Sequence, residues 1–359
     1  MNIALLSVGT LSNPKESARI TLLLHANSLI EEGHTVTIFA RKARDFPIEE
    51  KIGEVILHRI ASLYRYPQTL RTFQRESGTP FDIIHGFSAT PLLALLTKLA
   101  KINPKTKIIH TLKSYSKYKW QDYFHFALNL ADRVTVPTTV FSDKLRLVNK
   151  NKIQIVHSPI NTEKFYPQNK PMLKKKYGFN NDKVLFYYGA LWKNKGVDDL
   201  IDSLPFLIKE YKNIKLLIAP RYTKYQLLSP QLKRIQFLNL EPWVKFILED
   251  IFIEEYVNLA DVVVLPYRNL IGTEGNPSCL LEAMACKTPV VTTTLPELQE
   301  VAEGSVFMAT PSNVNSLAKN IRTALIHPSL EMVERAYHKS KEFKVENITK
   351  EFLKMYNAP

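Results

Sequence analysis

The chain has 359 residues, of which 45% are hydrophobic, and its 48 Lys and Arg against 34 Asp and Glu give a formal net charge of +14. This length exceeds the roughly 250–300 residues at which a single hydrophobic core usually divides, so two domains are expected. The excess of cations favours an anionic partner, such as a nucleotide diphosphate, an anionic lipid or nucleic acid. Nucleic acid is the weakest of the three, because no helix-turn-helix, zinc-finger or RNP-type motif accompanies the spread charge.

No stretch approaches the roughly 18 consecutive apolar residues of a membrane-spanning helix, and the N-terminus lacks the basic region of a signal peptide. A cytoplasmic location is therefore expected. The two cysteines, Cys279 and Cys286, lie seven positions apart on one predicted helix, too far along its axis for an unstrained disulfide. Both are interpreted as buried thiols.

The first half of the chain alternates short β-branched runs with segments of helical pattern. Between residues 17 and 32 the apolar side chains recur at helical spacing, and Gly33 is placed to end this helix as a C-cap glycine. Such alternation is typical of a parallel sheet with crossover helices. The predicted strands are residues 3–7, 35–40, 54–58, 82–85, 107–112, 133–136 and 153–157.

A proline-containing polar stretch, residues 158–183, is the best candidate for a linker. Beyond it the alternation restarts, with Ser229 expected as the N-cap of one helix. The second half is therefore predicted to form another doubly wound α/β domain, and such sheets bind ligands at the carboxyl ends of their strands. Its predicted strands are residues 184–188, 214–219, 244–248 and 262–266, and its helices are residues 197–211, 229–238 and 253–260.

One turn in the second half carries the clearest chemical signal. Asn276 suits an N-cap and Pro277 suits the first helical position, so a helix is predicted to start here with unpaired backbone N–H groups. A helix start of this kind binds anions, and Gly275 lacks the side chain that would keep a diphosphate away.

Two glutamates flank this turn. Glu274 precedes it, and Glu282 lies about a turn and a half into the helix, where its carboxylate is expected to reach a ribose diol. The structural alternative is that glutamates near a helix start are favoured by the helix dipole whether or not they bind a ligand.

Here the sequence resembles the retaining GT-B glycosyltransferases of family 4 (glycosyl transferases group 1), whose signature pairs two glutamates eight positions apart across such a turn. The resemblance covers nearly the whole chain, through motifs at residues 32–36, 81–85, 131–134, 189–196 and 259–266. It implies two Rossmann-like doubly wound domains that face each other across a cleft. The implied domains are an acceptor-side domain (1–165), a nucleotide-sugar-binding domain (166–340) and a C-terminal helix (341–359) that crosses back to the first.

The resemblance implies a retaining transfer from a UDP-, GDP- or ADP-sugar to a glycan, lipid-linked or small-molecule acceptor. Glu282 would hold the donor ribose, Glu274 would contact the donor sugar, and Lys195 would neutralise the diphosphate. No cofactor and no metal are expected, since the chain has no Asp-x-Asp pair suited to hold a divalent ion beside a diphosphate. Further donor contacts are expected at Gly189, Gly275, Asn276, Pro277 and Ser278.

On the donor side the chain departs from the family at one position. The family usually carries an arginine after the glycine that ends this strand, whereas here Gly189 is followed by Ala190. Arg221 and Arg268, each near the carboxyl end of a strand, are the candidates to supply the second cation.

The acceptor side departs further. The usual glycine-rich first loop is reduced to Gly9, followed further on by Lys15, Glu16, Ser17 and Ala18. Where the family places histidines, His85 occupies an inner-strand position and Lys113 an outward one. Gly9, His85 and Lys113 are the acceptor-side candidates, with the alternative that His85 is a hydrogen-bonded core residue.

The stretch at residues 115–126 interleaves cations with aromatic residues. Interfacial helices on anionic bilayers have this composition, and it would place the protein on the inner face of the membrane. The alternative is a crossover helix that packs its aromatic side chains inward.

Other functions stay open. The missing arginine and the altered first loop favour a non-catalytic GT-B subunit that binds a nucleotide or a partner enzyme. A GT-B sugar-nucleotide epimerase would need acid/base residues in the first domain that the sequence does not show. A nicotinamide-dependent dehydrogenase is disfavoured, because no Gly-x-Gly-x-x-Gly follows a strand.

Overall fold

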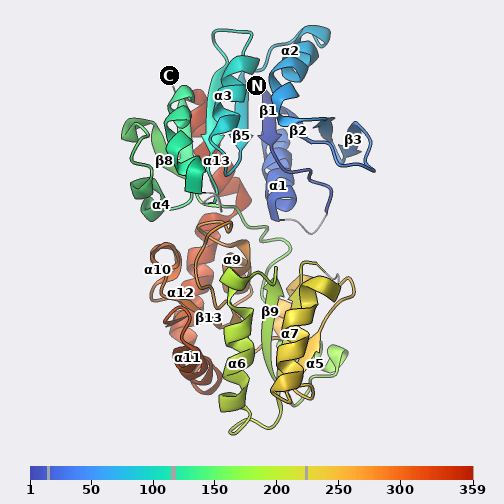
Figure 1. Ribbon diagram of the computed structural model, residues 1–359, viewed down its shortest axis with the longest axis vertical. Coiled ribbons are helices and arrows are strands. Elements are labelled where there is room, and N and C mark those ends of the chain that lie inside the picture. The colour runs from blue at the N-terminus through green and yellow to red at the C-terminus, as the bar shows by residue number, and fades with distance from the viewer. Residues whose placement is uncertain (14–16, 115–118, 223–224, 359) are drawn as a thin grey trace. The chain divides into compact units, whose positions relative to one another are not determined.

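The computed structural model describes residues 1–13, 17–114, 119–222 and 225–358, and it divides into two compact units (Figure 1). Unit 1 comprises Met1–Pro159, Ile271–Gly275 and Val345–Pro359, and unit 2 comprises Ile160–Leu270 and Asn276–Lys344. The first boundary lies after Pro159, whereas the sequence places it after residue 165. The short segment Ile271–Gly275 belongs to unit 1 although both of its neighbours in the chain belong to unit 2.

Unit 1 contains an eight-stranded sheet in the order β3-β4-β2-β1-β5-β6-β7-β8. Every neighbouring pair is parallel except β3 and β4. The strands are β1 (Asn2–Ser7), β2 (Thr35–Arg41), β3 (Glu49–Ile52), β4 (Val55–Ile60), β5 (Ile83–Phe87), β6 (Lys107–Thr111), β7 (Arg133–Val136) and β8 (Ile153–Ile155). The helices are α1 (Ser17–Glu31), η1 (Leu63–Arg65), α2 (Tyr66–Glu76), α3 (Leu92–Ala100), η2 (Lys119–Leu130), α4 (Thr139–Lys144), η3 (Lys150–Lys152) and α13 (Val345–Asn357).

Both faces of this sheet are covered. In β1, Ile3 and Leu5 pack in a cluster with residues of α1 and α13, whereas Ala4 and Leu6 pack in a cluster with residues of α2 and α3. A parallel strand that is buried on both faces reads as a continuous apolar run, which is why the sequence predicts β1 well.

Unit 2 contains a six-stranded sheet, entirely parallel, in the order β11-β10-β9-β12-β13-β14. The strands are β9 (Lys183–Gly189), β10 (Ile214–Pro220), β11 (Val244–Phe246), β12 (Val262–Val264), β13 (Val290–Thr293) and β14 (Phe307–Ala309). The helices are α5 (Lys170–Tyr177), η4 (Lys193–Lys195), α6 (Val197–Leu207), α7 (Tyr225–Phe237), α8 (Ile253–Leu259), α9 (Ser278–Ala285), α10 (Pro296–Ala302), α11 (Val314–Ile326), α12 (Leu330–Ser340) and η5 (Lys341–Phe343).

This sheet too is buried on both faces. Val184 and Phe186 of β9 pack with residues of α8 and α9, and Leu185 and Tyr187 pack with residues of α6 and α11. The prediction of two doubly wound α/β domains is therefore confirmed.

Several local predictions differ from the structure. The predicted strands of the second half include neither β13 nor β14. The sequence does not predict β3, because its residues Glu49–Ile52 are mostly polar and lie at an exposed sheet edge. Helix α7 begins at Tyr225, so Ser229 is not its N-cap and Pro230 lies inside the helix. A proline inside a helix removes one backbone hydrogen bond, and here it does not end the helix. The start of α9 also differs, as described below.

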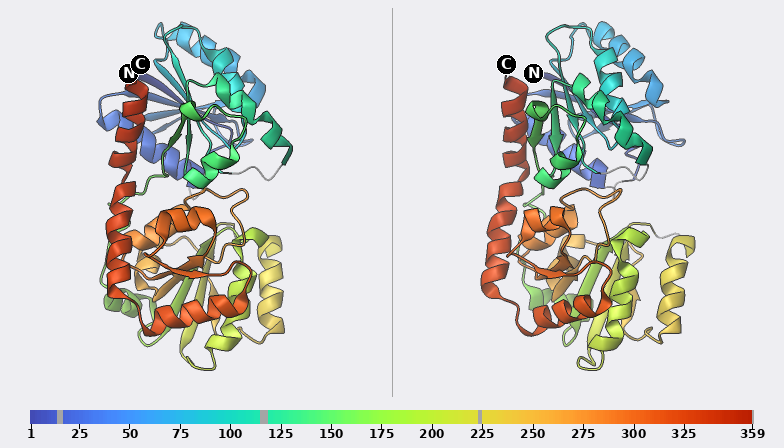
Figure 2. Two further views of the ribbon diagram at one scale, coloured as in Figure 1. Left: turned by 90° about the vertical axis from the view of Figure 1, so that its left-hand side faces the viewer. Right: turned by 60° about the vertical axis from the view of Figure 1, so that its left-hand side comes forward.

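The proline-containing stretch 158–183 carries α5, which begins after Asn169 and ends at Gly178 in the left-handed conformation. Its apolar residues Phe165, Leu173 and Phe179 are buried in the core of unit 2. At the other end of the chain, α13 packs against α1 in unit 1, and the two termini lie at the same end of that unit (Figure 2).

We expect Met355→Ala to lower the free energy of unfolding by about 2–5 kcal/mol, because Met355 lies on the buried face of α13 and truncating its side chain leaves a cavity. The neighbouring Lys354→Ala is the matched control and should stay within about 0.5 kcal/mol of the wild type, since Lys354 is exposed. Urea unfolding followed by circular dichroism measures both. Equal midpoints for Met355→Ala and the wild type would contradict the placement of α13 in the core of unit 1.

Candidate active site

Helix α9 begins one residue later than predicted. Pro277 occupies the N-cap and Ser278 is the first helical residue, whereas the sequence assigns the N-cap to Asn276. Asn276 is fully buried, so it is part of the packed interior. Because proline has no side-chain acceptor, Pro277 makes no side-chain hydrogen bond to the start of the helix.

Glu282 is held by a residue that the sequence analysis does not single out. The hydroxyl of Tyr188, at the carboxyl end of β9, donates to Oε2 of Glu282 over 2.8 Å and also lies 3.1 Å from the carbonyl oxygen of Cys279. Burial, and after it the Glu282 carboxylate, raise the pKa of Tyr188, so this hydroxyl stays a neutral donor. The sequence signal for Tyr188 is its position directly before Gly189 at a strand end.

The loop that carries Lys195 approaches the end of β12 very closely. Gly196 has a φ of +70°, and a Cβ there would lie 1.8 Å from the carbonyl oxygen of Pro266, so only glycine fits. This approach places Nζ of Lys195 at 4.8 Å from the ring centroid of Tyr267. The Tyr267 hydroxyl in turn lies 2.9 Å from Sγ of Cys279, in the first turn of α9.

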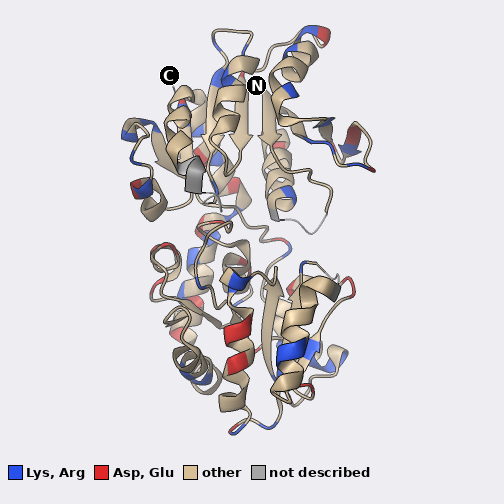
Figure 3. Ribbon diagram, viewed as in Figure 1, with Lys and Arg blue, Asp and Glu red and all other residues tan. Residues whose placement is uncertain are grey.

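The side chain of Arg268, which the sequence offers as a second cation for the diphosphate, forms an ion pair with Asp199. Its guanidinium donates to both carboxylate oxygens of Asp199, over 2.7 and 2.6 Å. Asp199 belongs to the acidic first turn of α6, and Figure 3 colours the acidic residues of this helix red. Its backbone N–H donates to the carbonyl oxygen of Asn194 over 2.9 Å. Arg268 therefore fixes the Lys195 loop from both sides.

Arg221 follows β10, and its backbone N–H donates to the carbonyl oxygen of Gly189 over 2.9 Å. Gly189 itself has a φ of +138°, so the backbone alone requires glycine here. Burial raises the pKa of the Cys279 thiol, and the nearby charges of Lys195 and Arg221 oppose this rise. Two cations thus act on the first turn of α9.

Glu274 belongs to unit 1, where three contacts anchor it. The backbone of Glu274 forms an antiparallel bridge with Ser114. Next to it, the N–H of Gly275 donates to the carbonyl oxygen of Lys113 over 3.2 Å. The Ser158 hydroxyl donates to Oε2 of the Glu274 side chain over 3.2 Å. The two glutamates that the sequence pairs, Glu274 and Glu282, consequently belong to different units.

Close packing against a neighbouring side chain requires glycine at position 275. A Cβ at this position would lie 2.7 Å from Cγ of Pro137, which follows β7 in unit 1. Close packing on a proline ring thus explains the residue without the diphosphate that the sequence analysis invokes.

His85 is a core residue. Its Nδ1 lies 2.6 Å from the hydroxyl of Tyr356, its Nε2 lies 2.6 Å from the hydroxyl of Thr111, and its ring stacks on Phe87. Burial lowers its pKa well below the usual range, so it is neutral. This is the alternative that the sequence left open, and it removes His85 from the acceptor-side candidates.

Gly9 lies past the end of β1, where its N–H donates to the Ser7 hydroxyl over 3.1 Å and its carbonyl oxygen accepts from Arg41. The following loop cannot be compared with the expectation, because residues 14–16 lie outside the described part of the chain.

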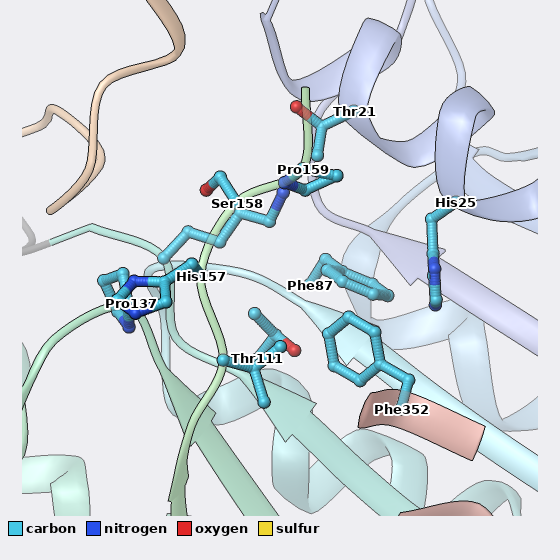
Figure 4. A pocket seen from close by; sticks show the side chains of 11 residues that line it. Thr21, His25, Phe87, Thr111, Pro137, His157, Ser158, Pro159 and Phe352 are labelled. Carbon is cyan, nitrogen blue, oxygen red and sulfur yellow. The ribbon is translucent and has the colours of Figure 1, made fainter. Parts of the chain in front are cut away.

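Lys113 lines a pocket of unit 1 that is formed at the carboxyl ends of β5 to β8 together with α1 and α13 (Figure 4). The space between the atoms that line the pocket is about 320 Å³, including open solvent at its mouth. The rings of Phe87 and Phe352 lie beside each other in it, with centroids 6.2 Å apart. The lining residues are Thr21, His25, Phe87, Thr111, Lys113, Pro137, Val156, His157, Ser158, Pro159 and Phe352.

Within the described ranges, His, Cys, Asp and Glu side chains form no group of three or more that could hold a metal ion. Among the same residues, no helix combines the length and hydropathy needed to cross a bilayer.

Two family models match the two halves of the chain. The model for Glycosyltransferase Family 4 matches residues 19–164, and the model for Glycosyl transferases group 1 matches residues 182–327. A related protein, N-acetyl-alpha-D-glucosaminyl L-malate synthase from Bacillus anthracis, is 26% identical over 298 residues, which cover 77% of this chain and 75% of the relative.

Solved structures share the architecture. Sucrose-phosphate synthase from Thermosynechococcus elongatus matches with a TM-score of 0.84 and 19% identity, over 99% of this chain and 98% of that one. Anabaena HepE in complex with UDP matches with a TM-score of 0.79 and 18% identity, over 99% of both chains. The chain therefore belongs to the GT-B glycosyltransferases, with a glycosyltransferase family 4 region followed by a glycosyl transferases group 1 region.

Proposed function

We propose that this glycosyltransferase takes its sugar from a nucleoside-diphosphate donor bound by unit 2 and transfers it with retention and without a metal. The observation that carries the proposal is the placement of Lys195 and Glu282 around the first half of α9. The Tyr188 hydroxyl contacts Glu282, and Nζ of Lys195 lies over the ring of Tyr267, whose hydroxyl contacts Cys279. A diphosphate at the start of α9 would face backbone N–H groups and two cations, and Glu282 would accept from the ribose hydroxyls. The UDP complex of the similarly folded HepE supports a nucleotide donor.

The proposed mechanism depends on stabilising the negative charge that develops on the leaving group. As the glycosidic bond breaks, negative charge grows on the leaving diphosphate, and Lys195 and Arg221 would stabilise it in place of a metal. The oxygen of the acceptor hydroxyl would then bond to the anomeric carbon on the face that the diphosphate leaves, which retains the configuration. The departing phosphate oxygen would take the proton of that hydroxyl. Glu274, oriented by Ser158, would contact the donor sugar. Arg268 would act only by positioning the Lys195 loop.

The acceptor would enter from unit 1, where the pocket beside Lys113 lies. The acceptor class stays as broad as a glycan, a lipid-linked sugar or a small molecule. The Bacillus anthracis relative is named as a synthase of a sugar–malate compound, and this name supports a small carboxylic acid among these acceptors.

We further propose that unit 1 rests on an anionic membrane surface of the cytoplasmic face. The first part of the stretch 115–126 lies outside the described residues, but Tyr123, Phe124 and Phe126 are 76%, 47% and 56% exposed. The inward packing considered as the alternative is therefore wrong for these three rings. Hydrogen bonds of Asn129 join η2 to the loop with exposed Leu147. The exposed Arg146 lies on that loop, and the exposed Lys150 begins η3 directly after it. Aromatic rings next to cations are the composition of a peripheral membrane surface.

We expect one of UDP, GDP or ADP to raise the melting temperature of the wild type and Glu282→Ala to abolish this shift. A ligand at about a hundred times its dissociation constant stabilises a fold by about 2.7 kcal/mol, which thermal-shift measurements detect readily. The matched control is Glu303→Ala, an exposed glutamate of the same unit, which should keep the full shift. EDTA should leave the shift unchanged.

No shift with any nucleotide would overturn the donor assignment and favour a non-catalytic GT-B subunit. A shift that EDTA removes would overturn the metal-free mechanism.

For the membrane surface, we expect the wild type to bind vesicles containing phosphatidylglycerol more strongly than vesicles of phosphatidylcholine alone. Replacing Tyr123, Phe124 and Phe126 together by Ser should weaken binding at least about tenfold, since each ring loses apolar contact with the lipid. The control is Phe237→Ser, which alters an exposed ring of unit 2. Equal cosedimentation of the triple variant and the wild type would contradict the proposal.

A further inference from the structure

Most polar side chains of the unit 1 pocket are already engaged in an internal network. Nε2 of His25 lies 3.3 Å from the hydroxyl of Tyr356, and Nδ1 of His25 lies 3.4 Å from that of Thr349. The hydroxyl of Thr111 lies 2.6 Å from His85 and 2.6 Å from Thr135. Burial lowers the pKa of His25 to about 3, so its ring is neutral. The Ser158 hydroxyl is used by Glu274, as described above.

Lys113 does not take part in this hydrogen-bond network. Its ammonium makes no hydrogen bond and no ion pair with any residue that the structure describes, although it lines the same pocket. Its near neighbours are the ring of Phe87, with the centroid 5.4 Å from Nζ, and the more distant charge of Glu274. Burial lowers the pKa of Lys113 and Glu274 opposes this, which is the condition of a cation that lacks a close counter-ion.

The hydroxyl of Thr21 is a second polar group of the pocket without a hydrogen bond to any described residue. Thr21 projects into the pocket from α1 (Figure 4), is 4% exposed, and has no hydrogen-bond partner among the described residues. No acidic side chain is among the eleven residues that line the pocket. A cation and a hydroxyl with unused hydrogen-bonding capacity, in a largely apolar pocket, suit the oxygens of an anion.

We propose that this pocket is a subsite for an anionic group of a substrate, a carboxylate or a phosphate, which the ammonium of Lys113 and the hydroxyl of Thr21 bind. The inference rests on the proposed function, because it assigns a chemical class to the substrate that unit 1 receives. The anion has two possible sources. It belongs either to the acceptor or, because Lys113 lies near Glu274, to the donor sugar as the carboxylate of a uronic acid.

The test compares anionic and neutral probes by isothermal titration calorimetry on the full chain. In the acceptor arm, glucuronate and glucose 6-phosphate are compared with glucose, with and without the nucleotide that stabilises the wild type. In the donor arm, UDP-glucuronate is compared with UDP-glucose. We expect the anionic member to bind more tightly in at least one arm, and Lys113→Met to weaken it about 10- to 100-fold while leaving the neutral member unchanged.

Lys113→Arg should retain the preference for the anion. The matched control is Lys105→Met, since Lys105 is exposed and precedes the amino end of the strand that Lys113 follows. Melting temperatures of all variants establish that they fold. The proposal is overturned if the wild type prefers the anion in neither arm, or if Lys113→Met keeps the preference.

The acceptor arm without nucleotide separates this inference from the proposed function. If no nucleotide binds the wild type, the donor assignment fails while the acceptor arm still reports on the pocket. If the nucleotide binds the wild type and Lys113→Met alike but neither arm shows a preference for the anion, only the subsite fails.

Discussion

Both sheets are buried on two faces, and this constraint decides where chemistry can occur in the protein. Along β1 and β9, successive side chains alternate between two apolar clusters, so the body of each strand has no room for a polar group that must meet a substrate. Polar and charged side chains gather instead where strands end. Tyr188 and Arg221 do so in unit 2, and Lys113 does so in unit 1.

Two glycines set the loops at these strand ends. Gly196 lets the Lys195 loop pass against the carbonyl oxygen of Pro266, and Gly275 lets its segment pass against the ring of Pro137. Lys195 directly precedes Gly196, and Glu274 directly precedes Gly275. Both residues have a role in the proposed reaction. Contacts between backbone and a proline have little freedom to adjust, so these side chains start from a well-defined position. Neither contact requires a bound ligand.

The sequence predicted those features that depend on continuous apolar runs and on spacing along the chain. It failed where the deciding contact joins distant residues. Strand β3 is too polar to be recognised without its partner β4, and the internal position of Pro230 in α7 runs against its usual meaning as a helix start. The paired glutamates were found from their spacing, but not the Tyr188 hydroxyl that orients one of them or the Ser158 hydroxyl that contacts the other. Those partners are 94 and 116 positions away in the chain.

The chain passes between the two units at four points, and two of them bracket the segment Ile271–Gly275. One glutamate of the pair is therefore carried by unit 1 and the other by unit 2, although a few peptide bonds join them. Substitutions in this segment would remodel the surroundings of Pro137 and Ser158 and leave the surroundings of Tyr188 and Glu282 intact. Within this architecture, the surroundings of the two glutamates can change independently of each other, although both lie in one short stretch of the chain.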